Sequence, residues 1–170
     1  MISIRPIDFN DTHKIVEWRN NPIVRKNFIF QQQLTDEMHI NWMETQVLAR
    51  KCYQFIIVDE DLNADVGSVF LRDVDMSNKK AEFGIFIGDD LSRGKGIGTN
   101  ATKQILKFAF EELELNKVFL RVFASNLGAI KSYEKAGFKK EGLFYQDVII
   151  NGTSEDLVFM AILKKEWINL

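Results

Sequence analysis

Arg93-Gly94-Lys95-Gly96-Ile97-Gly98 lies between a strand-like apolar run and a long helical pattern. Because glycine has no Cβ, three alternating glycines let the backbone pass close to a ligand. Several consecutive N–H groups can then point at one position near the positive end of the helix dipole. The stretch therefore predicts a site for a phosphate or pyrophosphate group.

The glycine spacing excludes two common nucleotide motifs. A dinucleotide fingerprint needs G-x-G-x-x-G, whereas here the glycines run G-x-G-x-G. A P-loop needs G-K-[ST], whereas Lys95 is followed by Gly96. On the loop alone, a plain strand-to-helix turn remains an alternative to a ligand site.

The segments on either side of the loop predict a parallel crossover. Ala81 to Ile87 reads as a strand before the loop, and Val118 to Phe123 as a strand after it. Between them, apolar residues at helical spacing predict a helix that ends near Glu114. A connection of this length allows the two strands to run parallel.

Further patterns complete an α/β domain. Short polar turns favour antiparallel pairing of the other strands, and Asn151-Gly152 between apolar runs predicts a hairpin. Further strands are expected over 2–8, 53–58, 66–71, 143–150 and 157–163, with helices over 12–20, 35–47 and 126–137. The fold class is therefore α/β, with a mixed and mostly antiparallel sheet.

Composition indicates one domain over residues 1–170, because no linker, repeat or low-complexity segment interrupts the chain. The net charge of -2 gives no reason to expect general nucleic-acid binding. Cys52 is the single cysteine and is expected to pack in the core. No signal peptide or membrane span is expected, which predicts a cytoplasmic location.

A second segment, downstream of the loop, makes the ligand more specific. Asn126, Ala129, Tyr133, Gly137 and Phe138 form the pattern N-x-x-A-x-x-x-Y-x-x-x-G-F, and the loop itself reads R-x-x-G-x-G. With these two motifs the chain resembles the GCN5-related N-acetyltransferase (GNAT) superfamily over nearly its whole length. It is most similar to the branch with ribosomal-protein-alanine, spermidine and amino-sugar N-acetyltransferases.

The resemblance implies that the two parallel strands splay apart at the centre of the sheet and that acetyl-CoA, the co-substrate, inserts between them. The pantetheine arm would then bind the backbone of the earlier strand, and the pyrophosphate would bind the loop amides. Asn126 would contact the cofactor arm. The cofactor-binding residues implied in this way are Ile85, Phe86, Ile87, Arg93, Gly94, Lys95, Gly96, Ile97, Gly98 and Asn126.

The resemblance also implies direct attack of a neutral primary amine on the thioester. Tyr133 occupies the family's general-acid position, from which its phenol can protonate the leaving thiolate. Glu82 lies where some relatives have a carboxylate base, and burial there is expected to raise the pKa of Glu82. Two alternatives to this base stay open: a water molecule that carries the proton, and Glu82 as a residue of the sheet surface.

The sequence says less about the amine that accepts the acetyl group. Trp18, Arg19 and Asn20 are candidates to bind it, since arginine pairs with carboxylate or phosphate and tryptophan can stack on a ring. They favour an anionic acceptor such as an amino-sugar nucleotide. Carboxylates at positions 36, 37 and 44 would instead suit a polyamine, and a protein N-terminus remains open. Both histidines, His13 and His39, are expected on helix surfaces, and no metal site is predicted.

Three classes compete at this level. The leading one is an acetyl-CoA-dependent N-acetyltransferase, whose partners are acetyl-CoA and an amine. An acyl-CoA-binding sensor without catalysis is the non-enzyme alternative, and a structural domain without a cofactor is the third. The resemblance also makes a homodimer plausible, although no residue pattern establishes it.

Overall fold

The computed structural model describes residues 1–169 and contains a seven-stranded sheet in the order β1-β2-β3-β4-β5-β7-β6. Within those residues, β4 and β5 form the one parallel pair, and all other neighbours are antiparallel. The strands are β1 (Ile2–Pro6), β2 (Tyr53–Asp59), β3 (Ala64–Asp75), β4 (Lys80–Ile87), β5 (Lys117–Phe123), β6 (Lys139–Ile150) and β7 (Thr153–Leu163). The predicted mixed, mostly antiparallel sheet is confirmed.

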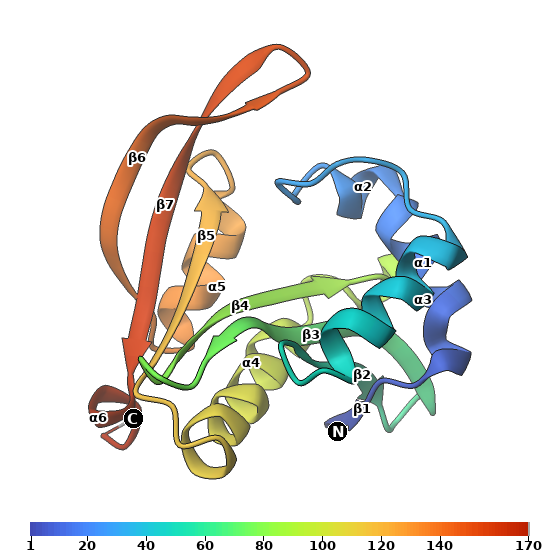
Figure 1. Cartoon of the computed structure of the whole chain (residues 1–170), viewed down its shortest axis with the longest axis horizontal. Coiled ribbons are helices and arrows are strands. Elements are labelled where there is room, and N and C mark those ends of the chain that lie inside the picture. Colours follow the sequence, from blue (N-terminus) through green and yellow to red (C-terminus); the bar gives the residue numbers. More distant parts are fainter. Residues whose placement is uncertain (170) are drawn as a thin grey trace.

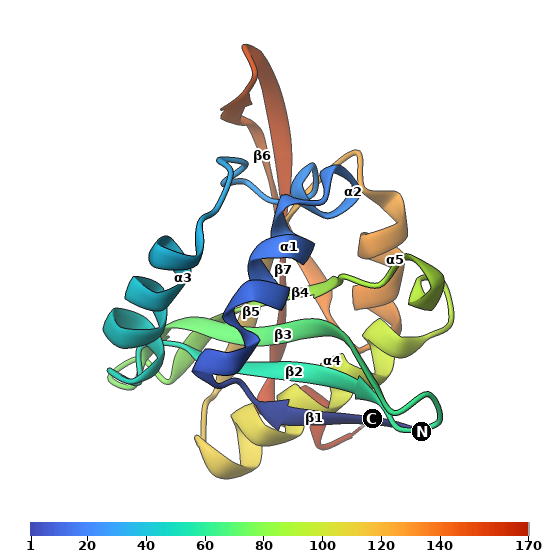
Figure 2. The same cartoon turned by 90° about the vertical axis from the view of Figure 1, so that its right-hand side faces the viewer.

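Helices cover both faces of the sheet (Figures 1 and 2). On one face lie α1 (Thr12–Asn20), α2 (Pro22–Arg25) and α3 (Asp36–Trp42), and on the other lie α4 (Ile97–Lys107) and α5 (Leu127–Lys135). A short α6 (Lys164–Trp167) follows β7. No helix within residues 1–169 is long and apolar enough to cross a bilayer.

The apolar core has two parts, one on each face. The larger part packs α4 and α5 against the central strands and includes Ile105, Phe110 and Leu71. The smaller part lies under α1 and α3 and includes Ile15 and Met43. Cys52 belongs to this second part, and burial raises its pKa to about 12, so the thiol packs as an apolar group, as predicted.

Most element boundaries agree with the sequence pattern to within a few residues. The first helix ends at Asn20, but Pro22 then occupies the first turn of α2, a short helix that was not predicted. Two predicted helices, over 35–47 and up to Glu114, end in wider π turns at Met43–Val47 and Phe108–Glu112. The hairpin turn at Asn151 and Gly152 is confirmed, with φ of 49° and 82°.

The parallel pairing of β4 and β5 is short, and this positions the site. It covers Lys80↔Lys117, Ala81↔Val118 and Glu82↔Phe119 only. Beyond Glu82, β4 stays paired with β3 as far as Ile87, whereas β5 stays paired with β7 as far as Phe123. The sheet therefore divides into two halves that diverge from Glu82 onward, as Figure 1 shows for β4 and β5.

Candidate active site

A cavity of about 1060 Å³ occupies the gap between the diverging strands. Its wall is contributed by the glycine loop, by β4 and β5, by α5, and by the segment from α1 to α3. The two motifs found in the sequence thus meet at one cavity, although more than thirty residues separate the loop from Tyr133.

The glycine loop forms one end of this cavity. Gly94 and Gly96 have φ of 77° and 78°, a left-handed conformation in which a Cβ is unfavourable. Gly96 is the N-cap of α4, so the first amides of that helix lie at the cavity wall. The buried Ser92 hydroxyl also lines it and has no hydrogen-bond partner among residues 1–169. These donors fit a pyrophosphate.

Arg93 holds the loop in place. Its guanidinium donates from Nε and from Nη2 to the Ile87 carbonyl, 3.2 Å in each case, and its Nη1 lies 2.5 Å from Asp90 Oδ1. Asp90 is therefore paired with Arg93. Lys95 is exposed and does not line the cavity.

The other predicted cofactor residues line the cavity wall. Ile85, Phe86 and Ile87 follow the last β4–β5 pair, so β5 does not pair with their backbone. Ile97 and Gly98 lie at the start of α4. Asn126 caps α5 by accepting from the Ala129 amide at 3.2 Å, and its side-chain amide also donates to Asn27 Oδ1.

Tyr133 lies in the same cavity wall, on α5. Its ring packs edge-on against Phe83, with centroids 5.8 Å apart, and against Phe138. Burial raises the pKa of Tyr133 to about 12. The phenol is therefore neutral at pH 7 and carries a proton that it can donate.

Glu82 lies at the point where the strands divide, and its environment differs from the expected one. Arg121 on β5 donates to it at 2.9 Å from Nε, and Arg72 on β3 donates at 3.1 Å from Nε. Burial alone would raise the pKa of Glu82, but these two guanidinium groups outweigh burial and lower it. The predicted rise in pKa was wrong, because the sequence did not reveal the two arginines opposite the carboxylate.

Basic and aromatic side chains form the far end of the cavity. Arg19 lines it, with its guanidinium 3.6 Å above the Phe28 ring centroid. Burial, together with the charge of Arg72, lowers the pKa of Arg19 to about 10. His39 also lines this end and is 5% exposed, so the expectation of a helix-surface position was wrong. Its ring faces inward and bonds Thr12 Oγ1 at 3.0 Å.

Trp18 and Asn20 do not line the cavity. Trp18 packs edge-on against Phe86 and lies directly against the backbone of Gly88, where a Cβ would meet its ring at 2.2 Å. Asn20 accepts from the Leu34 amide at 2.8 Å and donates to the Leu34 carbonyl at 2.9 Å. The structure therefore places Trp18 in the packing under α1, and Asn20 as a clamp on the segment between α2 and α3.

The charge of the lining is strongly positive. Its only carboxylate among the described residues is Glu82, and its cationic side chains are Arg19, Arg72, Arg93, Arg121, Lys131 and Lys135. Asp36, Glu37 and Glu44 are exposed and lie outside it. Within residues 1–169, no cluster of three or more His, Cys, Asp or Glu side chains could hold a metal ion.

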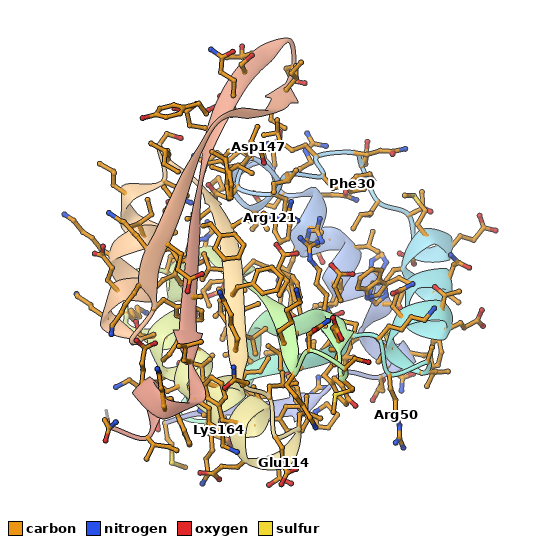
Figure 3. All side chains as sticks on the ribbon, turned by 60° about the vertical axis from the view of Figure 1, so that its left-hand side comes forward. Phe30, Arg50, Glu114, Arg121, Asp147 and Lys164 are labelled. Atoms are coloured by element: carbon orange, nitrogen blue, oxygen red, sulfur yellow. The ribbon has the colours of Figure 1, made fainter. Side chains whose placement is uncertain are left out.

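Sequence reasoning missed several lining residues. Arg72 and Arg121 each stand inside an otherwise apolar strand pattern, and that interruption could have marked them. Phe28 and Phe30, in the segment between α2 and α3, carried no signal because this segment has no periodicity. Figure 3 labels Phe30 in this segment and Arg121 on β5.

Comparison with known proteins places this geometry in a family. A putative ribosomal N-acetyltransferase, YdaF, of Bacillus subtilis (strain 168) is 39% identical over 59% of this chain and 55% of its own length. Spermidine N(1)-acetyltransferase of Vibrio cholerae serotype O1 is 32% identical over 68% of this chain and 66% of its own length. The chain thus matches less than two thirds of the length of these relatives.

The fold has a solved counterpart as well. The structure of spermidine N-acetyltransferase from Vibrio cholerae in complex with CoA and spermine superposes with a TM-score of 0.92, at 24% identity, over 99% of this chain and 98% of that one. At this identity the likeness shows the fold alone. The profile of the Acetyltransferase (GNAT) domain matches residues 2–139, which is most of the chain. The predicted superfamily is confirmed, and the chain belongs to the GNAT acetyltransferase domain family.

Proposed function

We propose that this protein is an acetyl-CoA-dependent N-acetyltransferase that transfers the acetyl group to a primary amine by direct attack. One observation carries the proposal: the glycine loop, Tyr133 and the basic end of the cavity, where Arg19 and His39 lie, all line a single cavity. Donor and acceptor can therefore meet in the gap of the sheet. Membership of the family supports the same reaction.

The donor end suits acetyl-CoA. The pyrophosphate binds the amides around Gly94 and Gly96, where the orphaned Ser92 hydroxyl offers a further donor. The pantetheine arm lies along Ile85 to Ile87, where β5 no longer pairs with β4 and the free edge of β4 can pair with an amide-bearing chain. This arm directs the thioester toward Tyr133.

In the chemical step, the neutral amine attacks the thioester carbonyl carbon, the C–N bond forms, and the C–S bond breaks. Tyr133 donates its hydroxyl proton to the departing thiolate, and a proton lost by the amine restores the phenol through solvent. Because its pKa is raised to about 12, Tyr133 keeps this proton throughout the neutral pH range.

We assign Glu82 a positioning role and give the removal of the amine proton to water. A general base works best with a pKa near the operating pH, whereas the pKa of Glu82 is lowered by Arg121 and Arg72. Those two ion pairs hold both guanidinium groups at the cavity wall. Glu82 therefore positions Arg72 and Arg121 at the basic end of the cavity, and it is not the base that removes the amine proton.

The charge of the lining favours an anionic acceptor, such as an amino-sugar nucleotide. The printed name of the spermidine acetyltransferase relative points to a polyamine, but a polyamine at this end would meet Arg19, Arg72 and Arg121 and one carboxylate that is already paired. The carboxylates that could hold a polyamine, Asp36, Glu37 and Glu44, lie outside the cavity. A protein N-terminus is the second candidate acceptor, suggested by the name of the ribosomal relative.

The test is release of free CoA thiol from acetyl-CoA over a panel of amines. The panel contains amino-sugar nucleotides, spermidine, peptides with free N-termini and aminoglycosides. We expect turnover to be highest with an amino-sugar nucleotide. Thermal shift with acetyl-CoA and CoA accompanies it, since a ligand that binds the native state raises the melting temperature. If neither compound stabilises the protein, the proposal fails.

The same experiments address the non-enzyme alternative. An acyl-CoA sensor would be stabilised by CoA and would release no thiol with any amine of the panel. Tyr133 lines the cavity and carries a proton that it can donate, which supports an enzyme over a sensor. A homodimer and a cytoplasmic location remain predictions of the sequence.

A further inference from the structure

The basic end of the cavity contains two buried polar atoms without partners. Among residues 1–169, the Arg19 Nε–H and the His39 Nε2 atom are shielded from solvent and make no hydrogen bond. Both residues line the cavity. Buried polar atoms are rarely left unsatisfied, since each costs about 1–3 kcal/mol. Two such atoms in one wall indicate a ligand that supplies acceptors.

The charge of Arg19 also lacks compensation. Arg19 forms no ion pair within the described part of the chain, and the neighbouring charge of Arg72 contributes to its lowered pKa. Burial lowers the pKa of His39, and the charge of Arg19 acts in the same direction. The acidic groups that act on His39 are Asp36 and Asp11, and Asp11 is itself bound by Arg5. An anion between Arg19 and His39 would relieve this imbalance.

The surrounding structure holds both side chains in place without a ligand. Thr12 bonds the Nδ1 atom of His39, which fixes the ring of this cavity-lining residue and leaves Nε2 without a partner among residues 1–169. The ring of Phe28 supports the guanidinium of Arg19. Asn20 fixes the segment that carries Phe28 by its two bonds to Leu34. Two polar side chains held in place in this way are typical of a binding subsite.

We infer that Arg19 and His39 form an oxyanion subsite that binds a phosphate group of a nucleotide-linked acceptor. This inference rests on the proposed function, since it names the group by which the acceptor is held. The wall beside the subsite is apolar and aromatic, with Phe30, Met38 and Trp42. Such a wall suits the planar base of a nucleotide better than it suits a small dicarboxylate.

The test measures equilibrium binding to protein saturated with CoA, so that the glycine loop is already occupied. The probes are UDP, dTDP, inorganic pyrophosphate and succinate, and calorimetry measures the affinity of each. The variants are Arg19→Gln and His39→Gln, and Arg25→Gln is the matched control, because Arg25 lies on the adjacent α2 and outside the cavity lining. CoA affinity of each variant reports whether it is folded.

We expect a nucleoside diphosphate to bind the wild-type protein and the Arg25→Gln variant equally. Arg19→Gln should weaken this binding about 10- to 100-fold, as expected for the loss of a charged hydrogen bond, with CoA affinity unchanged. In the wild-type protein, the ring signals of His39 should shift in NMR spectra on addition of the probe. This readout needs no substitution and remains available if Arg19→Gln does not fold.

Three results would overturn the subsite: no probe binds at millimolar concentration, binding is insensitive to Arg19→Gln, or the His39 signals do not move. Binding of succinate alone would replace the phosphate by a carboxylate and reject the nucleotide. These outcomes are distinct from failure of the proposed function, which would appear as absent CoA binding or absent thiol release.

Discussion

Arg121 on β5 and Glu82 on β4 are joined at 2.9 Å, Nε to Oε1, across the point where the two strands separate. The contact connects the two halves of the divided sheet (Figure 3 labels Arg121). The charge of Asp147, on the β6–β7 hairpin, further raises the pKa of Arg121. The ion pair thus lies at the point where β4 and β5 separate and the cavity between them begins.

Replacing Glu82 by Gln should reduce stability by about 1–3 kcal/mol at pH 7, since both arginines, about a third exposed, lose their counter-charge. The folded pKa of Glu82 lies below the unfolded value of about 4.3, so its contribution is complete above that value and is lost as pH falls through the folded pKa. Urea unfolding at several pH values should show the difference between the two proteins disappearing in acid.

Glu111→Gln is the control for this charge change, because Glu111 forms an exposed ion pair with Lys107 at 3.9 Å on the outer side of the helix. Its effect should stay below about 0.5 kcal/mol. An equally small effect of Glu82→Gln would show that the arginines need no carboxylate to stay in place.

Tyr133→Phe should lower kcat about 10²- to 10⁴-fold while the KM for acetyl-CoA stays within about twofold. The ring contacts with Phe83 and Phe138 are preserved in this variant, so folding should not change. Steady-state thiol release measures both constants. Turnover equal to that of the wild-type protein would remove Tyr133 from the mechanism.

Gly96→Ala should weaken CoA binding about tenfold, because alanine is strained at a φ of 78° and the loop amides would move. Gly152→Ala is the matched control: it introduces the same left-handed strain, at a φ of 82°, in the hairpin turn and away from the cavity. Both variants should lose about 1–2 kcal/mol of stability. If calorimetry gives equal CoA affinities for the two, the loop amides do not bind the cofactor.

Asn20→Ala should raise the KM for the amine severalfold and leave CoA affinity unchanged, since the clamp on Leu34 positions the segment that carries Phe28 and Phe30. Loss of two hydrogen bonds should also cost about 1–3 kcal/mol of stability. Asn41→Ala, an exposed site on α3, serves as the control. A KM unaffected by Asn20→Ala would mean that this segment does not bind the acceptor.

Periodicity and turn chemistry predicted most of the fold, since they act locally. Gly137 after the last turn of α5 and Asn151-Gly152 in the hairpin favour their own backbone conformation, and all three have positive φ. The short α2 was not predicted, because a proline both ends one helix and begins the next.

The site could be predicted from the sequence only where residues close together in the chain form it. The glycine loop and the helix with Tyr133 are continuous motifs and were located from the sequence. The partners of Glu82 come from two other strands, and their register is a property of the folded sheet. The burial of His39 is also a property of the folded chain, and the weak sequence pattern of its helix did not predict it.

The two ends of the cavity come from separate stretches of chain. Residues 15–42, together with Arg72, Glu82 and Arg121, line the end that we propose for the acceptor, whereas residues 83–99 and 126–135 line most of the end that we propose for acetyl-CoA. If the proposed division is correct, mutations in residues 15–42 alter which amine is accepted and leave the glycine loop unchanged. Residues 15–42 are therefore the segment to vary in experiments that aim to change the acceptor.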